Sequence, residues 1–254
     1  MAGTTPATAA GPVETRSATS VFTATEVAAE AAAEPGRPVY AHRGGRAGGL
    51  VENTRDNFRR AAAGGSLQWE TDVRFTSTNY PVLLHDEDLR RFGCPTVKIV
   101  SVSVPKAREC AAVNGQTLTT LYEFITDLEA FDAQAMVELK TVPTAAQWTI
   151  LETRLSPVRD RVVIESFLAD ALVAASQRGY QTAALSSTAL TPARLPQGSD
   201  WYAPNWTALT DAGLAAMHAQ GVKVVVWTPE CADWARLPTG VDALISDDLP
   251  TECG

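Results

Sequence analysis

The stretch PVYAHRG, residues 38–44, is a short apolar run that ends in a histidine and an arginine. A second run, PVLLHD at residues 81–86, ends in the same way in a histidine and an aspartate. Between them, WETDV at residues 69–73 carries two acids two positions apart, which therefore face the same side of a strand. Because buried unpaired carboxylates are costly in a core, this pattern indicates the rim of a reactive site.

From residue 38 onward, apolar runs alternate with amphipathic segments. The segment 211–219 illustrates the helical ones: Thr210 is a plausible N-cap, Leu214 and Met217 follow at helical spacing, and Gly221 ends the pattern. The strands expected on this basis are 38–42, 69–73, 81–85, 135–139, 161–166, 182–186, 200–204 and 222–227. The helices expected are 53–63, 118–129, 144–154, 168–178, 211–219 and 231–236.

Eight strands interleaved with helices predict a (β/α)₈ barrel of the TIM type. A doubly wound sheet is the alternative, but no Gly-rich phosphate-binding fingerprint follows the first strand. The barrel should be irregular between its second and third strands, because residues 74–80 leave no room for a crossover helix. A further extended piece, residues 241–246, remains outside the count of eight.

The four cysteines fit two disulfides, for which three connectivities exist. We favour Cys94–Cys110 and Cys231–Cys253, since each pair closes a local loop; four reduced thiols are the alternative. The first pair lies in residues 86–116, a long connection of the kind that is usually functional or stapled. No two cysteines have the spacing of a zinc site, and disulfides imply an oxidising compartment.

Composition limits the classes of partner. The chain has 254 residues, 45% of them hydrophobic, which suffices for one large core. Its formal net charge is −8 with no basic stripe, which argues against nucleic acid and against anionic membrane surfaces. No apolar run approaches the roughly 18 residues that a membrane span requires. We expect a monomer.

Residues 1–36 differ from the rest in being rich in Ala, Thr, Glu and Pro. We expect a poorly ordered or loosely packed arm here, with a short helix over 23–34, followed by a single domain over 37–254. There is no charged start followed by an apolar segment, so no signal peptide is visible. The expectation is a mature secreted protein whose signal has been removed.

Catalytic groups of such barrels sit at the carboxyl ends of the strands. There the chain places three carboxylates, Glu70, Asp72 and Glu138, which make an all-oxygen site suited to one Mg²⁺ or Ca²⁺ ion. Arg43 and Lys140 are cations suited to a phosphate group. A metal beside two such cations can offset charge that develops on phosphoryl oxygens.

His42 and His85 suit a general acid and base pair near neutral pH. One would protonate the leaving alkoxide while the other deprotonates the nucleophile. The residues do not tell which is which, nor whether water or a substrate hydroxyl attacks. Phe167 and Trp227 should line the mouth. Asp86 should be an orienting partner or a turn acceptor rather than a ligand. We expect His218 on a helix surface and Asp247 and Asp248 in turns.

As an ordered set, these residues resemble the glycerophosphodiester phosphodiesterases. The resemblance covers about residues 38–250 and is specific only through the order of its pieces. Those pieces are HRG at 42–44, ENT at 52–54 with Phe58, the two acids at 70 and 72, HD at 85–86 with Leu89 and Arg91, Leu118 with Leu121, ELK at 138–140, SF at 166–167, VWT at 226–228 and GVDALISD at 240–247.

The resemblance implies a (β/α)₈-type fold and a divalent-metal phosphodiesterase that releases glycerol 3-phosphate and an alcohol. It implies that Glu70, Asp72 and Glu138 bind the metal and that His42 and His85 are the acid and base.

The phosphate contacts implied by the resemblance are Arg43 and Lys140. Glu52 and Asn53 match a motif near the site, either close to the metal or supporting Arg43. The family also normally has a short connection between the residues matching Asp72 and His85.

The chain departs from the family pattern in two places. Residues 76–80 read TSTNY where relatives often carry Thr-x-Asp-Gly, which alters a turn and not a catalytic group. Pro229 and Glu230 stand where an Asn often follows the VWT motif, which leaves the outer pocket, and so the substrate, open. The first hypothesis is hydrolysis of deacylated phospholipids such as glycerophosphocholine. Lysophospholipase D activity on lysophospholipids is the alternative, and it needs an apolar groove that loops 86–116 and 187–200 would supply or block.

Two other classes fit less well. A non-catalytic binding barrel would lack a ligand or a histidine, and none is missing. An aldolase or sugar isomerase barrel would not require both histidines and two phosphate-directed cations.

Overall fold

The computed structural model describes residues 1, 3, 37–46, 49–113 and 115–253. All helices and strands in these ranges belong to the compact unit Ala31–Gly254. The arm predicted over 1–36, with its helix over 23–34, lies outside the described residues apart from Met1 and Gly3.

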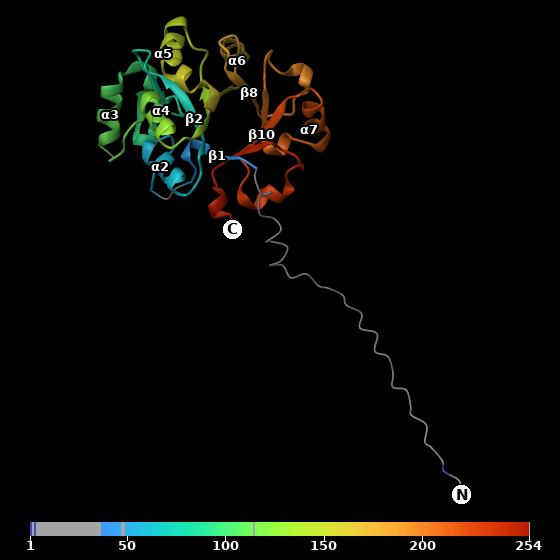
Figure 1. Ribbon diagram of the computed structural model, residues 1–254. Coiled ribbons are helices and arrows are strands. Elements are labelled where there is room, and N and C mark those ends of the chain that lie inside the picture. Colours follow the sequence, from blue (N-terminus) through green and yellow to red (C-terminus); the bar gives the residue numbers. More distant parts are fainter. Residues whose placement is uncertain (2, 4–36, 47–48, 114, 254) are drawn as a thin grey trace. The chain divides into compact units, whose positions relative to one another are not determined.

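Eight parallel strands close into a barrel, and helices surround it (Figure 1). The pairing of β1 with both β11 and β2 closes the ring, with Ala41 opposite Trp69. The barrel strands are β1 (Val39–Ala41), β2 (Gln68–Phe75), β6 (Gln134–Leu139), β7 (Val162–Ser166), β8 (Gln181–Ser186), β9 (Trp201–Pro204), β10 (Lys223–Trp227) and β11 (Ala243–Ser246). The predicted TIM-type fold is therefore confirmed.

Most of the predicted helices are present with slightly different ends. Capping boxes start two of them, at Thr120 with Glu123 and at Thr144 with Gln147, and Thr210 caps a third as predicted. The helices are α2 (Arg55–Ala63), α3 (Val104–Ala112), α4 (Leu121–Ala130), α5 (Ala145–Leu155), α6 (Ala169–Ser176) and α7 (Asp211–His218). The helix predicted over 231–236 is a 3₁₀ turn, Cys231–Arg236.

One predicted barrel strand is wrong. Strand β3 (Pro81–Leu83) runs antiparallel to β2, with Leu83 opposite Val73, and so lies outside the parallel ring. The eighth ring member is β11, in the extra piece 241–246. A hairpin needs only a short turn, whereas a parallel pair needs a long crossover, which is why residues 76–80 suffice. The predicted irregularity after the second strand is thus real.

The connection over 86–116 is more ordered than predicted. It contains an antiparallel ribbon of β4 (Asp88–Leu89) and β5 (Cys94–Lys98), followed by α3. A satellite core supports it, formed by Val82, Leu84, Leu89, Phe92, Ile99, Ala107, Ala111 and Leu118. The sequence analysis did not predict α3, because Val104 and Pro105 in its first turn are poor helix formers. Proline is nevertheless well tolerated at that position.

Both favoured disulfides are confirmed. Cys94 pairs with Cys110, with Cα atoms 6.4 Å apart, and joins the ribbon to α3. Cys231 pairs with Cys253, with Cα atoms 5.4 Å apart, and joins the 3₁₀ turn after β10 to the end of the described chain. Each bond restrains a segment that packs beside the barrel mouth or its rim.

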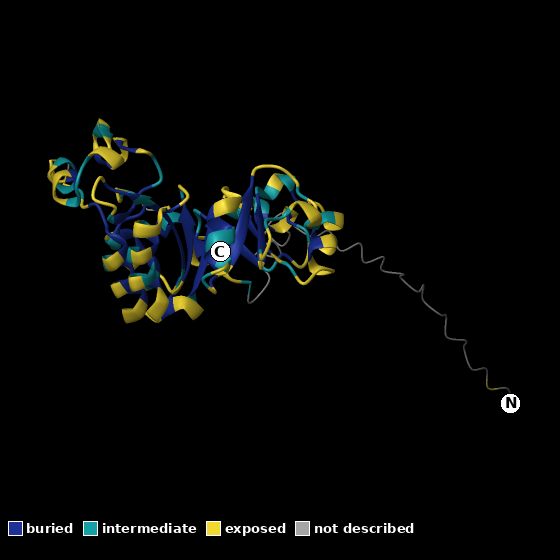
Figure 2. Ribbon diagram, turned by 90° about the horizontal axis from the view of Figure 1, so that it is seen from above, coloured by how far each residue is buried: buried dark blue, intermediate teal, exposed yellow. Residues whose placement is uncertain are grey.

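The barrel strands are largely buried, as Figure 2 shows by their dark blue colour against the yellow outer faces of the helices. Apolar side chains fill the barrel below its mouth: Tyr40, Met136, Val163, Ala183, Leu185, Trp201, Ala203, Val225, Ala243 and Ile245. A second core between helices and strands includes Phe58, Trp69 and Phe124, whose ring centroids lie 4.8–5.8 Å apart. The mouth therefore stands on a rigid base.

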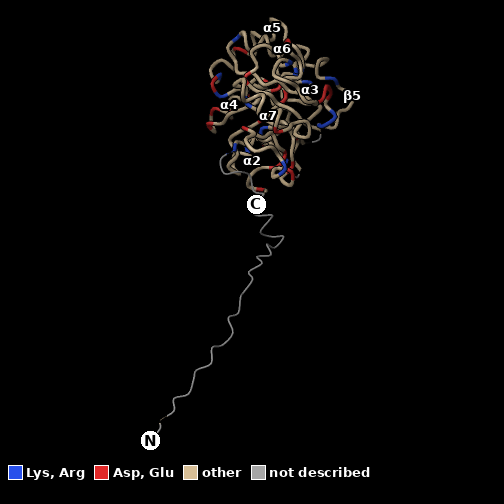
Figure 3. The backbone as a smooth tube through the Cα atoms, turned by 90° about the vertical axis from the view of Figure 1, so that its right-hand side faces the viewer, with Lys and Arg blue, Asp and Glu red and all other residues tan. Residues whose placement is uncertain are grey.

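Lys and Arg positions are interspersed with Asp and Glu positions around the fold (Figure 3). No helix within the described residues has the length and apolar character needed to cross a membrane.

Candidate active site

A row of three acids, Asp72, Glu138 and Glu165, runs across three neighbouring barrel strands. Asp72 of β2 is in register with Glu138 of β6, and Glu138 is in register with Glu165 of β7. Glu70 precedes Asp72 by two residues and shares its face. The acid triad is a different set and consists of Glu70, Asp72 and Glu138. Each of these buried residues offers an oxygen within 4.8 Å of the others.

The acid triad carries more negative charge than its neighbours neutralise. Burial, reinforced by the nearby carboxylates, raises the pKa of Glu70 well above its usual value and that of Glu138 to about 7. Burial also works to raise the pKa of Asp72, but Arg43 and Lys140 outweigh it and hold that pKa below its usual range. Two of the three carboxyls therefore hold a proton more readily than exposed glutamates do when no further positive charge is present.

Lys140 and Arg43 surround Asp72. Lys140 Nζ lies 3.2 Å from Asp72 Oδ1 and 2.9 Å from Glu138 Oε2, while Arg43 Nε lies 3.0 Å from Asp72 Oδ2. With Glu70 and Glu165 added, two cations face four buried acids. Hard oxygen donors with uncompensated charge suit Mg²⁺ or Ca²⁺, so the residues present fit a divalent cation.

His42 is held by a carboxylate from the far end of the chain. Its Nδ1 lies 2.6 Å from Asp247 Oδ1, and its Nε2 lies 3.9 Å from Glu70 Oε2. The hydrogen bond with His42 is the largest cause of the lowered pKa of Asp247. An imidazole that donates from Nδ1 keeps Nε2 for proton transfer. Asp247, predicted as a turn residue, is therefore a partner of His42.

His85 has the same arrangement. Its Nδ1 lies 3.0 Å from Asp86 Oδ1, which confirms the predicted orienting partner. Burial, with Arg43 and Lys140 in support, lowers the pKa of His85 although Asp72 and Asp86 oppose the shift. Both imidazoles thus have Nδ1 bound to a carboxylate and Nε2 available to the site.

The turn after β1 aims Arg43 into the mouth. Its backbone has φ 53°, a left-handed conformation that brings its N–H within 3.0 Å of Glu70 Oε2. Its guanidinium donates to Glu52 Oε1 at 3.2 Å, so Glu52 supports Arg43, one of the two roles predicted for it. Gly44 follows at φ 93°, where a Cβ atom would lie 2.8 Å from the Asn57 side-chain nitrogen.

Asn53 orients a triad carboxylate. Its amide donates to Asp72 Oδ2 at 2.8 Å, and its carbonyl oxygen accepts from Thr71 Oγ1 at 2.7 Å. It adopts φ 61°, a conformation that asparagine tolerates better than most residues. Asn53 therefore fixes the position of Asp72 from inside the core.

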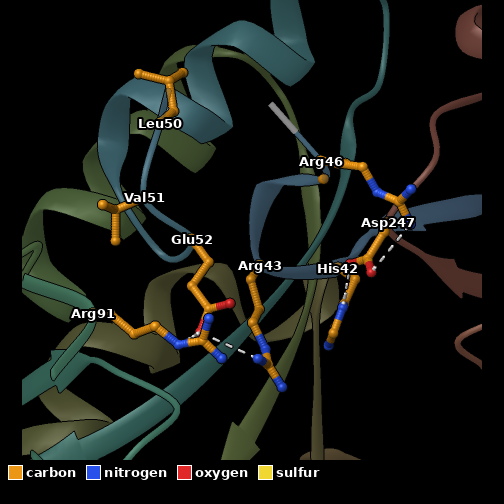
Figure 4. A pocket seen from close by; sticks show the side chains of 9 residues that line it. His42, Arg43, Arg46, Leu50, Val51, Glu52, Arg91 and Asp247 are labelled. Atoms are coloured by element: carbon orange, nitrogen blue, oxygen red, sulfur yellow. Dashed lines mark hydrogen bonds and ion pairs between the residues drawn. The ribbon is translucent and has the colours of Figure 1, made fainter. Parts of the chain in front are cut away.

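Two cavities meet at His42 and Arg43. The first, here called the polar cavity, has a volume of about 370 Å³, and Figure 4 shows Glu52 between Arg43 and Arg91 and Asp247 beside His42. Its lining is His42, Arg43, Gly45, Arg46, Leu50, Val51, Glu52, Arg91 and Asp247.

The second, here called the aromatic cavity, has a volume of about 220 Å³. Besides His42 and Arg43 its lining is Glu70, His85, Glu138, Lys140, Glu165, Phe167, Leu185, Trp227 and Ile245. Phe167 and Trp227 pack edge to face with ring centroids 5.8 Å apart. The two residues predicted for the substrate pocket therefore lie together at its wall.

All the predicted site residues converge on this mouth; their catalytic and binding roles remain predictions. Sequence reasoning missed Glu165 and the role of Asp247. Glu165 had a signal, because it interrupts an apolar run, VVIES at 162–166. Asp247 had one too, since it ends an apolar run as His42 and His85 do.

The sequence pattern of the Glycerophosphoryl diester phosphodiesterase family matches residues 42–251. The chain belongs to this family. It is accordingly an enzyme of the glycerophosphodiester phosphodiesterase class. This agrees with the resemblance found in the sequence and with the geometry of the mouth.

Individual proteins resemble the chain in sequence and in fold. The chain is 27% identical over 236 residues to a probable glycerophosphodiester phosphodiesterase 2 of Mycobacterium tuberculosis, covering 84% of this chain and 88% of the relative. The solved glycerophosphodiester phosphodiesterase of Thermotoga maritima has a TM-score of 0.68 at 25% identity, covering 84% of this chain and 95% of that one. An Oleispira antarctica phosphodiesterase, solved with the product sn-glycerol-3-phosphate, has a TM-score of 0.72 at 22% identity, covering 85% and 94%.

Proposed function

We propose that this family member hydrolyses glycerophosphodiesters to glycerol 3-phosphate and an alcohol with the help of one divalent cation, Mg²⁺ or Ca²⁺. The observation that carries the proposal is the meeting of the acid triad, two phosphate-directed cations and two oriented histidines where the polar and aromatic cavities join. The product found with the Oleispira relative supports the same chemistry.

The cation would be held by the acid triad, and when bound it supplies positive charge against charge developing on the phosphoryl oxygens. Arg43 and Lys140 would bind the phosphate, the first as a fork and the second as a point charge. Glu52 and Asn53 would keep Arg43 and Asp72 in place.

The histidines would act on the two sides of the phosphorus. His42 lines both cavities, whereas His85 lines only the aromatic cavity. We assign His42 as the acid: the bond from phosphorus to the leaving alcohol breaks, and the Nε2 proton of His42 passes to the alkoxide in the polar cavity. His85 would take the proton of the attacking oxygen, from water or from a substrate hydroxyl.

A second candidate is lysophospholipase D action by the same site. Exposed apolar side chains on loops after neighbouring strands favour it: Phe167 and Leu168 follow β7, and Val142 lies beyond β6. An acyl chain on the glycerol would find apolar surface there.

We further propose secretion, a monomeric state and a catalytic domain over 37–254 behind an N-terminal arm. The two disulfides support an oxidising compartment. A variant that begins at residue 37 should keep the turnover of the full chain and elute as a monomer in size-exclusion chromatography. Loss of turnover in that variant would contradict the domain boundary.

Phosphorus NMR tests the function directly. The full chain, with Mg²⁺ or Ca²⁺, is given a mixture of glycerophosphodiesters and lysophospholipids. Appearance of glycerol 3-phosphate supports the first candidate, and conversion of lysophospholipids alone favours the second. No conversion with either ion contradicts both.

A further inference from the structure

Glu165 has a buried carboxyl oxygen without a partner. Its Oε2 makes no hydrogen bond to any described residue, although Glu165 is only 1% exposed. A buried polar atom left unpaired in a native fold calls for an explanation, and a bound ligand is one. Glu165 lines the aromatic cavity, so a ligand placed there can reach it.

The neighbours of Glu165 leave this oxygen to the substrate. The lining of the cavity includes Arg43 and Lys140, which the proposed function assigns to the phosphate, and the residues assigned to the cation and to proton transfer. The rest of the lining is apolar or aromatic: Phe167, Leu185, Trp227 and Ile245. The indole N–H of Trp227 is not free, because it donates to the backbone oxygen of Ala203 at 2.9 Å.

A hydroxyl group suits this oxygen better than a cation does. Within the described residues, the group of carboxylates close enough to share an ion is the acid triad, and Glu165 is not part of it. With a divalent cation held by the acid triad, as the proposed function has it, that ion together with Arg43 and Lys140 balances the four buried acids, so no net negative charge remains to attract a cationic head group. A hydroxyl is neutral and both donates and accepts, so it pairs with either form of a carboxyl.

We propose that Glu165 binds a hydroxyl group on the glycerol arm of the substrate and thereby selects phosphate esters of polyols. The inference rests on the proposed function, since it takes the phosphate to lie at Arg43 and Lys140. The apolar wall covers the carbon chain of the same arm. A ligand without the hydroxyl leaves Oε2 unpaired, and sites built in this way strongly reject the analogue that lacks the group.

Calorimetric titration of the full chain, saturated with Ca²⁺, tests the proposal with two probes. The probes are sn-glycerol 3-phosphate and n-propyl phosphate, which differ in the two hydroxyls. Wild type should prefer the glycerol ester by about tenfold or more. Glu165→Leu should remove most of that preference, and Glu165→Gln should retain part of it, because an amide can still pair with a hydroxyl.

Ile245→Val is the matched control, since it trims the apolar wall of the same cavity. It should weaken both probes alike and leave their ratio unchanged. Propane-1,2-diol 1-phosphate and propane-1,3-diol 1-phosphate, tested on wild type, then tell which hydroxyl Glu165 binds.

Three outcomes would overturn the proposal. The first is that wild type binds both probes equally. The second is that Glu165→Leu keeps the full preference for the glycerol ester. The third comes from titrating Ca²⁺ alone. If Glu165→Leu loses as much affinity for Ca²⁺ as it loses for the glycerol ester, Glu165 belongs to the cation site instead. If any of these results is found while wild type still turns over glycerophosphodiesters, this inference is contradicted and the proposed function stands.

Discussion

The two halves of the barrel mouth differ in what they present. The half formed by β2, β6 and β7 carries the row Asp72, Glu138 and Glu165, whereas the next residue in register, on β8, is Ala183. From β8 to β11 the side chains that line the aromatic cavity are Leu185, Trp227 and Ile245. One continuous sheet thus supplies both a charged wall and an apolar one.

The difference lies in how each wall is held. On the charged half, positions depend on specific partners, such as Asn53 on Asp72 and Lys140 on Glu138. On the apolar half, packing in the barrel core suffices, and packing tolerates small changes of shape. Substitutions should therefore be far more harmful on the charged half.

The largest expected effect comes from the acid triad. Asp72→Asn keeps the shape but removes one charge from the cation site, so turnover of glycerophosphocholine should fall by about a thousandfold or more. Calorimetry with Ca²⁺ should record weaker binding in parallel. Near-normal Ca²⁺ affinity together with near-normal turnover would refute the metal-ligand role.

The histidines should separate by leaving group. Loss of either should lower turnover by about 10²–10⁴-fold on a choline ester. With p-nitrophenol, which needs little protonation, His42→Ala should recover much of its loss while His85→Ala should not. The reverse pattern would exchange the assigned acid and base, and no recovery in either variant would argue against acid catalysis.

Asn53→Ala probes the support of the charged wall. Partners of metal-binding carboxylates typically contribute about 10–100-fold to affinity or activity, so a fall of that size is expected in both. Asn79→Ala is the control, because Asn79 also has a left-handed backbone, φ 60°, in which alanine is equally strained, but it lies in the β2–β3 turn. Equal losses in the two variants would point to backbone strain as the cause.

The metal-free protein should lose stability as pH rises from 5 to 8. The folded pKa of Glu138 is about 7 against an ordinary 4.5, and those of Glu70 and Glu165 are also raised, so the folded state binds more protons than the unfolded one in this window. The lowered pKa of His85 opposes the trend, but three carboxyls outweigh one imidazole.

Melting temperatures in chelator at pH 5, 6, 7 and 8 measure this trend. Glu138→Gln should flatten it, and Ca²⁺ should reverse it by displacing the protons. A melting temperature that rises steadily from pH 5 to 8 in chelator would contradict the expected protonation of the acids.

The apolar half should give the smallest effect. Leu185→Val removes one methylene, and turnover should change by less than about tenfold, mainly through KM. Steady-state kinetics on glycerophosphocholine decides this. A loss as large as that of Asp72→Asn would erase the distinction between the two walls.

The sequence by itself determined the fold class and most residues of the mouth, and it favoured the two disulfide pairings that the structure contains. These follow from local patterns: apolar runs of strand length, loops closed by nearby cysteines, and charged residues at strand ends. The order of motifs also sufficed to find the family, since each motif is a contiguous piece of chain.

Only the tertiary structure decided how distant pieces combine. It made Pro81–Leu83 a hairpin partner and Ala243–Ser246 a barrel strand, because strand direction depends on which neighbour accepts the hydrogen bonds. It brought Asp247 to His42 across 205 positions and set Glu165 beside Glu138 through strand register. Pairing across the sheet is a property of the closed barrel, and no local pattern along the chain encodes it.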